Sequence, residues 1–257
     1  MKKQLMRVVA LALGVAMLAA ATASAGNVLV VRAGNLILKD SGGITPLKLP
    51  RHEQAPITAD LHGEISTMDG THPPAVRHLD VKIDRTIELD ATGLPSCTLA
   101  DVTARATAEA KRACPKAIIG SGDAEVEVEF PESEPFRAKG PIVVFNGGTR
   151  AGKTVLLIHT YVAVPAPTAV VSIAKVRHLH GGRFGLEAVV DIPAVAGGAG
   201  SATSFDLRLG RRFTFKGEQR SLITASCPTG SYRTEGKVSF DDGTKMELQH
   251  DLPCIPA

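Results

Sequence analysis

The chain is long enough to bury a full core, and its nearly balanced charge argues against binding nucleic acid or acidic membranes by charge alone. It has 257 residues, with 29 lysines and arginines against 26 aspartates and glutamates, and three of the basic residues (Lys2, Lys3 and Arg7) stand at the very start. Tryptophan is absent and aromatic residues make up only 4%, which disfavours the exposed aromatic platforms that bind sugars or single-stranded nucleic acid.

The first 25 residues predict an export signal that is not part of the fold. The basic start precedes an apolar stretch over residues 8–20, and Ala23-Ser24-Ala25 matches a small-x-small cleavage site. A membrane anchor, the alternative, is disfavoured because the stretch is shorter than the roughly 20 residues that a spanning helix needs. We therefore expect cleavage after Ala25, a secreted or extracytoplasmic location, and no membrane span in the mature chain.

The rest of the chain, residues 26–257, predicts a single β-sandwich domain. Residues 26–76 are expected to form an irregular arm with short strands at 27–32 and 35–38, because residues 39–74 are rich in Gly, Pro, His and Asp. Beyond the arm, short apolar runs alternate with turn signals, which predicts an all-β fold, mainly an antiparallel sandwich of jelly-roll type. The expected strands cover residues 78–83, 86–90, 123–130, 141–145, 155–164, 169–176, 184–192, 203–215, 221–225, 232–240 and 244–250.

One short helical insertion is expected around residues 98–113. Thr98 with Asp101 three residues later forms a helix-start signal, and Cys114 followed by proline ends the helical pattern. A straight helix would hold Cys97 and Cys114 about 25 Å apart, whereas a disulfide needs Cα atoms within roughly 7 Å. Either the insertion folds back around Arg105 or these cysteines do not pair, and we expect the fold-back.

Four cysteines in an exported chain predict two disulfides rather than a metal site or reactive thiols. In the last hairpin, a three-residue loop over residues 241–243 puts Val238 opposite Met246 and glycine at the left-handed position, whereas a two-residue loop would put the apolar positions out of step. Extending this ladder brings the last two cysteines together at the open end. The predicted pairs are Cys97–Cys114 and Cys227–Cys254.

Residues 123–130 carry the clearest strand signal. Even-numbered positions are apolar and odd-numbered positions are acidic, which predicts one face toward the core and one acidic face in solvent. We interpret the acidic face as a solubility feature rather than a cation site, because glutamates usually remain exposed.

Residues 147–154 match the phosphate-binding pattern G-x-x-x-x-G-K-T through Gly147, Gly152, Lys153 and Thr154. Phosphate binding by this motif requires a helix that begins at the lysine, whose free N–H groups face the phosphates. Here residues 154–164 are apolar and β-branched, which predicts a buried strand. The motif is therefore expected to be a glycine-rich hairpin turn, and no cofactor is predicted.

His178 and His180 lie two residues apart, so they would point the same way from a strand and, with His159, could hold zinc or copper. Arginines nearby and the lack of an adjacent acidic or thiol ligand argue against this, and no metal is expected. The sequence also contains no nucleophile elbow, zinc-protease motif or calcium loop.

Five short motifs stand along the chain: Leu94-Pro-Ser-Cys97, Ala110-x-x-x-Cys114, Ile119-Gly-Ser-Gly122, Phe145-Asn-Gly147 and Cys227-Pro-Thr-Gly230. They resemble those of a loosely defined group of exported proteins from high-GC Gram-positive bacteria, a group without an assigned activity. The likeness extends from Leu94 over most of the chain and implies a disulfide-bonded β-sandwich; it supplies no catalytic residue.

These patterns predict a non-enzymatic protein of the cell envelope or extracellular space that binds an unknown protein or surface partner through its loops. One alternative is a secreted hydrolase whose site is assembled from separate strands, which a sequence alone does not reveal. The other is a metal-binding protein that uses the histidines above.

Overall fold

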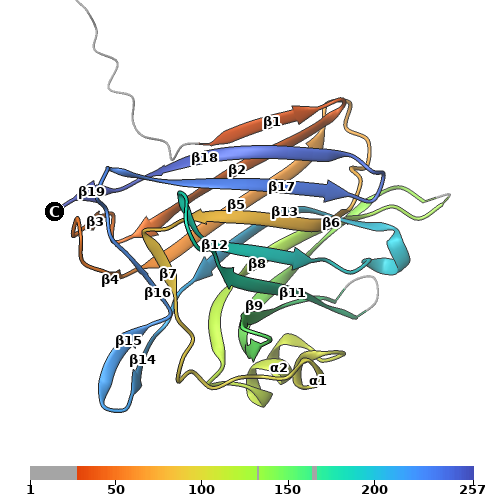
Figure 1. The fold of residues 1–257 in the computed structure, drawn as a ribbon. Coiled ribbons are helices and arrows are strands. Elements are labelled where there is room, and N and C mark those ends of the chain that lie inside the picture. Colours follow the sequence, from red (N-terminus) through yellow and green to blue (C-terminus); the bar gives the residue numbers. More distant parts are fainter. Residues whose placement is uncertain (1–27, 132, 164–166) are drawn as a thin grey trace, which may run out of the picture.

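The structure is a computed structural model that describes residues 28–131, 133–163 and 167–257, and the chain in these ranges is mostly strand (Figure 1). The all-β fold with one short helical insertion is therefore confirmed. The predicted export signal lies outside the described residues. Within the described part of the chain, no helix has both the length and the apolar character needed to cross a membrane.

Strands and helices follow one another in this order. The first half contains β1 (Leu29–Ala33), β2 (Leu36–Thr45), β3 (Lys48–Leu49), β4 (Ala55–Pro56), β5 (Thr58–Thr67), β6 (Val76–Asp84), β7 (Ile87–Leu89), α1 (Leu99–Val102), α2 (Thr107–Ala113), β8 (Ile118–Val128) and β9 (Phe136–Arg150). The second half contains β10 (Lys153–Val162), β11 (Thr168–His178), β12 (Phe184–Asp191), η1 (Ala196–Gly198), β13 (Gly200–Leu209), β14 (Arg212–Phe215), β15 (Glu218–Ser221), β16 (Ile223–Ala225), β17 (Ser231–Phe240), β18 (Lys245–Pro253) and β19 (Ile255–Pro256).

One large sheet dominates the molecule. Its twelve strands pair in the order β1-β2-β5-β13-β8-β9-β10-β11-β12-β6-β17-β18, and neighbouring strands are antiparallel throughout. The sheet folds over so that β18 at one end faces β2 near the other (Figure 1), where the side chains of His250 and Asp40 are in contact. The two layers of the sandwich are thus halves of one continuous sheet.

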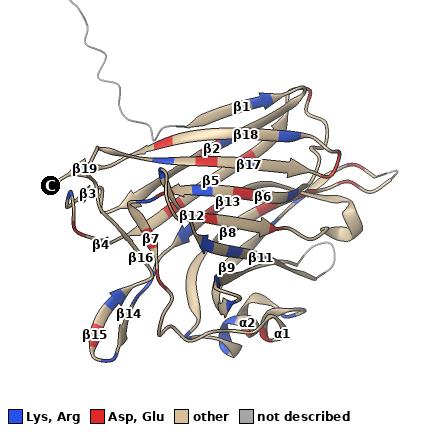
Figure 2. Cartoon of the chain, viewed as in Figure 1, with Lys and Arg blue, Asp and Glu red and all other residues tan. Residues whose placement is uncertain are grey.

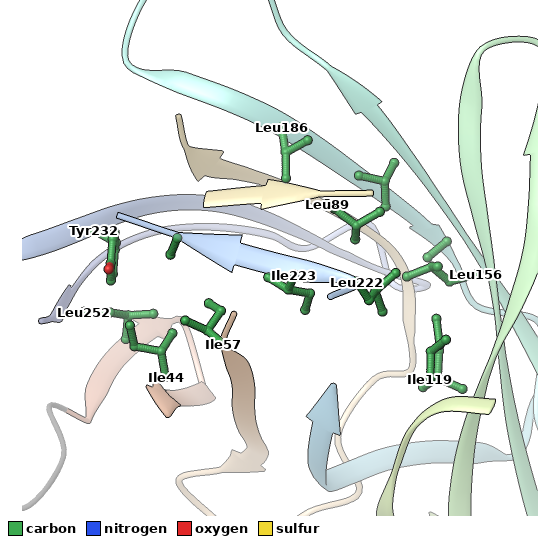
Figure 3. Packing of buried hydrophobic residues seen from close by; sticks show 14 of the residues in the cluster. Ile44, Ile57, Leu89, Ile119, Leu156, Leu186, Leu222, Ile223, Tyr232 and Leu252 are labelled. Carbon is green, nitrogen blue, oxygen red and sulfur yellow. The ribbon is translucent and has the colours of Figure 1, made fainter. Parts of the chain in front are cut away.

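Two of the apolar clusters between the layers lie at the two ends of the β17–β18 hairpin. The first, here the disulfide-end cluster, includes the small sheet β4-β16-β7, and Figure 3 shows Leu222 and Ile223 lying between Leu89 and Ile57. The second, here the hairpin-end cluster, lies near the turn between β17 and β18. Members of the disulfide-end cluster include Ile44, Ile57, Leu89, Leu222, Ile223, Cys227, Tyr232, Leu252 and Cys254. The hairpin-end cluster consists of Leu36, Leu38, Val76, Val238, Phe240 and Met246.

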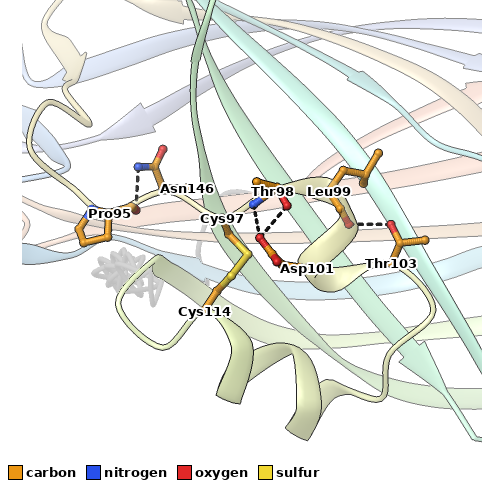
Figure 4. The surroundings of a disulfide bond; sticks show 8 residues. All are labelled: Pro95, Cys97, Thr98, Leu99, Asp101, Thr103, Cys114 and Asn146. Carbon is orange, nitrogen blue, oxygen red and sulfur yellow. Dashed lines mark hydrogen bonds between the residues drawn. A yellow bond between two sulfur atoms is a disulfide. The ribbon is translucent and has the colours of Figure 1, made fainter.

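The two short helices form the predicted fold-back. Asp101 accepts hydrogen bonds from the backbone N–H of Thr98 at 2.9 Å and from its hydroxyl at 2.6 Å, which caps α1 (Figure 4). The chain reverses at Ala104, whose φ is 56°, and α2 returns so that Cys97 and Cys114 pair with Cα atoms 5.8 Å apart. The helices cover the outer face of β9 and β10, where a third cluster is buried, here the helix cluster: Cys97, Val102, Ala110, Ala117, Val143, Phe145, Val155 and Leu157.

The last hairpin and its disulfide also confirm the prediction. Val238 pairs with Met246, and Gly243 takes a φ of 89° in the three-residue loop. At the open end of the hairpin, Cys227 and Cys254 form the second disulfide. The described residues contain no free cysteine.

The prediction of an irregular arm over residues 26–76 is wrong. Two ten-residue strands, β2 and β5, fall inside it and belong to the large sheet. Two of its glycines, Gly42 and Gly63, fit closely against the neighbouring strand. A Cβ atom at Gly63 would lie 2.4 Å from the ring of Phe205, so this glycine makes room for a side chain on the next strand. The expected strand over residues 203–215 is also divided, between β13 and β14.

The acidic face of residues 123–130 is less exposed than predicted. Glu125 pairs with Arg137 and Lys139, and Glu127 pairs with Arg137 and His72, so that both carboxylates are largely covered. Phe130, which the alternation places toward the core, lies beyond the end of β8 and is exposed. Neighbouring basic side chains, which the periodicity of one strand does not reveal, account for the covered carboxylates.

Candidate functional site

One face of the large sheet lines the space between the layers. On this face the side chains change from apolar to small or polar halfway along the strands. On β2, β17 and β18 the inward positions next to the two ends are apolar and buried, in the disulfide-end and hairpin-end clusters. Between them the inward positions are small or polar. We call this set the central belt: Asp40, Gly42, Thr234, Gly236 and His250.

Apolar side chains around the central belt remain partly open to solvent. Leu61 on β5 shares the inner face with Ala59, which packs against the disulfide-end cluster, yet Leu61 is 39% exposed. A Cβ atom at Gly42 would lie 3.7 Å from Leu61 and 3.9 Å from Leu252 of the opposite layer, which places Leu61 beside the belt. Further inward apolar side chains that are only partly buried are Ile65, Leu79, Val81, Ala124, Ile158, Val190, Phe205, Leu207 and Leu248.

This incomplete burial is unusual, because inward side chains of a sandwich normally fill the space between its layers. The strands that carry these residues have hydrogen-bonded neighbours on both sides, apart from the edge strand β18. Their exposed area therefore lies on the inner face itself. Solvent reaches apolar surface between the layers at the level of the belt.

A polar pair joins the two layers within the belt. The ring nitrogen Nδ1 of His250 lies 2.9 Å from Oδ2 of Asp40, and the exposed fractions of the two side chains are 6% and 32%. Because a carboxylate only accepts hydrogen bonds, Nδ1 carries the proton of this bond. The other ring nitrogen, Nε2, is buried and has no partner among the described residues.

Tyr232 lies diagonally across from His250, since Tyr232 pairs with Leu252 and His250 with Thr234. The ring is fully buried in the disulfide-end cluster (Figure 3), and its hydroxyl has no partner among the described residues. Burial raises the pKa of Tyr232 to about 12, and the carboxylate of Asp84 adds to this shift. The phenol therefore remains protonated at physiological pH.

The opposite face of the same layers has a different character. Across β11, β12, β6 and β17 the outward side chains alternate in sign, and Figure 2 shows basic and acidic residues side by side on these strands. Arg177 pairs with Glu187, and Lys175 and His78 both contact Asp191. On the outer face several charged groups therefore pair with one another, and Oδ1 of Asp80 on β6 is, like Nε2 of His250, buried without a partner among the described residues.

A second cluster has the residue types of a hydrolase triad. Oγ of Ser201 lies 3.1 Å from Nε2 of His72, whose Nδ1 lies 3.1 Å from a carboxylate oxygen of Glu127. The hydroxyl of Ser201, however, donates to the carbonyl of Pro73 at 2.6 Å.

This proton arrangement opposes nucleophilic catalysis. A catalytic serine donates its proton to a histidine that acts as base, whereas the hydroxyl of Ser201 donates to the carbonyl oxygen of Pro73. Ser201 is also only 2% exposed, and Arg137 occupies the other oxygen of Glu127. We interpret this cluster as a structural tie between β13, β8 and the segment before β6.

The phosphate-loop motif lies in a β-hairpin. Lys153 is the first residue of β10 and pairs with Arg150 of β9 across a turn at Ala151 and Gly152. No helix follows the lysine, so the row of free N–H groups that would hold phosphates does not form there.

The three candidate metal ligands are not brought together. His159 is fully buried beneath the helices, with Nε2 3.0 Å from the carbonyl oxygen of Arg105. It pairs with Val171, seven residues from His178 along β11, or about 23 Å at the rise of a strand. In the described ranges, the one group of three residues with metal-ligand geometry is Cys97, Asp101 and Cys114, and both of its sulfurs belong to a disulfide.

His178 instead borders an open cavity of about 530 Å³ that is also lined by Leu186 of the disulfide-end cluster. Its lining is mixed in polarity and, among the described residues, contains no unpaired buried side-chain group. The residues around it are Arg85, Ile87, Glu88, His178, Leu179, Gly185 and Leu186.

The central belt was not predicted from the sequence, although a signal for it is present. His250 falls on the same parity as Met246 and Leu248, so a polar side chain stands at a core position of a predicted strand. Asp40 likewise falls on the same parity as Leu36 and Leu38, but the composition of residues 39–74 predicts an irregular segment at this position. Comparison with family models, curated proteins and solved structures finds no match to the chain.

Proposed function

We propose that this is an exported, non-catalytic protein that binds an apolar molecule between the two layers of its sheet, at the central belt. Export is supported by the leader-like first 25 residues and by two disulfides, which persist in oxidising compartments. The proposed binding site lies on the inner face of the sheet, whereas the sequence alone predicts that a partner binds through the loops.

The observation that carries the proposal is the exposure of Leu61 on the inner face. An apolar side chain that remains 39% exposed among other inward apolar side chains is surface that a ligand can cover. Covering such surface stabilises a complex by about 25 cal/mol per Å². An apolar molecule seated there would complete the core between the disulfide-end and hairpin-end clusters.

A titration with a neutral dye that fluoresces in apolar surroundings tests this proposal. We expect saturable binding to the purified chain, and we expect Leu61→Asp to weaken it at least about tenfold, because the new carboxylate loses hydration when the dye binds. Met68→Asp is the matched control, since Met68 is more exposed, at 58%, and lies in the turn after β5.

Absence of saturable binding by the unaltered chain would contradict the proposal, whatever the variants do. Equal loss of affinity in both variants would also contradict it, because the dye would then bind elsewhere. Thermal unfolding of each variant, followed by circular dichroism, provides the check that the fold is intact.

A further inference from the structure

We infer that the molecule bound at the central belt carries a hydroxyl head, which donates a hydrogen bond to the Asp40–His250 pair. This inference rests on the proposed function and adds the polar chemistry of the ligand to it. It is based on the buried, unpartnered Nε2 of His250 and on the partly exposed carboxylate beside it.

His250 presents an acceptor. Its Nδ1 proton is held by the carboxylate of Asp40 at 2.9 Å, so in the neutral ring the lone pair lies on Nε2. Nε2 is buried without a partner among the described residues, and such an atom costs free energy until a donor reaches it. A ligand that donates a hydrogen bond would remove this cost.

Asp40 presents a second acceptor. Oδ2 is occupied by His250, while Oδ1 has no hydrogen-bond partner among the described residues and the side chain is 32% exposed. Because Asp40 lies on the inner face, opposite Gly63 and beside Gly42, its exposed part is next to the apolar surface of Leu61 and Phe205. The site thus combines two acceptors with an apolar wall.

This combination selects among head groups. A hydroxyl donates to either acceptor without bringing charge into apolar surroundings. A carboxylate head has no proton to donate when ionised, and its charge is repelled by Asp40 at short range, where screening by water is weak. A long-chain alcohol is therefore expected to bind more tightly than the fatty-acid anion of the same chain length.

Displacement of the apolar dye by 1-decanol and by decanoate at pH 8 tests the inference. We expect decanol to displace the dye at a concentration about tenfold lower than decanoate does. In Asp40→Asn the difference is expected to shrink to about threefold or less, because the repelling charge is gone. His250→Gln, which removes the imidazole acceptor, is expected to weaken the binding of decanol more than that of decanoate.

A matched control lies on the outer face of β5 and β13. His62 and Asp206 form a similar pair at 2.7 Å, away from the belt, so Asp206→Asn should leave the preference unchanged. If the unaltered chain binds both compounds equally, or binds decanoate more tightly, the inference of a hydroxyl head is wrong. Dye binding would still support the proposed function in that case. If neither compound nor the dye binds, the proposed function itself fails. Displacement from the unaltered chain separates these outcomes even if Asp40→Asn does not fold.

Discussion

The helix cluster lies on the outer face of the large sheet and the central belt on its inner face, and the two regions differ in how completely they are packed. Beneath the helices, Val102, Ala110 and Phe145 are fully buried, and a disulfide fixes the cover in place. At the belt, Leu61 remains exposed and Nε2 of His250 remains unpaired among the described residues. Buried polar atoms without a partner among the described residues occur in both regions, Nδ1 of His159 beneath the helices among them. Since folding alone favours complete packing, the incompletely packed region is the better candidate for binding.

The largest effect on stability is expected where packing is complete. Phe145→Ala would leave a cavity beneath the helices and lower the free energy of unfolding by about 3–5 kcal/mol. Urea denaturation followed by circular dichroism measures it. A loss below about 1 kcal/mol would mean that the helix cluster is not the packed region described here.

The disulfide of the helix module is expected to have the next largest effect. Replacing both Cys97 and Cys114 by alanine removes a link across 17 residues and should lower the free energy of unfolding by about 3 kcal/mol. Dye binding at the belt should remain, because the helices lie on the outer face of the sheet. Loss of binding in a variant that is still folded would contradict the separation between the two regions.

The smallest effect is expected at the belt. Leu61→Ala should change the free energy of unfolding by less than about 1 kcal/mol, because part of the side chain is already in water. The same substitution at Leu157, which is buried in the helix cluster, should cost about 2–5 kcal/mol. Equal costs at the two leucines would show that the inner face is as tightly packed as the outer one.

Features set by residues close in the sequence were predictable. The cap of Thr98 by Asp101, the fold-back and the three-residue loop before Thr244 follow from local spacing and from the reach of a disulfide. The same local rules failed for residues 26–76, because glycines that fit against neighbouring strands have the same composition signal as irregular chain.

The candidate site depends on contacts between residues far apart in the chain. Asp40 and His250 are separated by 210 residues, and their contact follows from the folding over of a twelve-stranded sheet. The Ser201–His72 contact spans 129 residues and is equally invisible in the sequence. Periodicity identifies the inward positions on each strand, but it does not say which of them meet or which remain open to solvent.

Binding between the layers can be located by photolabelling and peptide mapping. An alkyl probe that carries a light-activated diazirine would be bound to the purified chain, irradiated, and located by mass spectrometry. We expect the label on inward residues around the belt, Leu61, Phe205 and Leu248 among them, and we expect excess 1-decanol to prevent it. Labelling confined to the outer face or to the helices, or labelling that decanol does not reduce, would contradict binding at the belt.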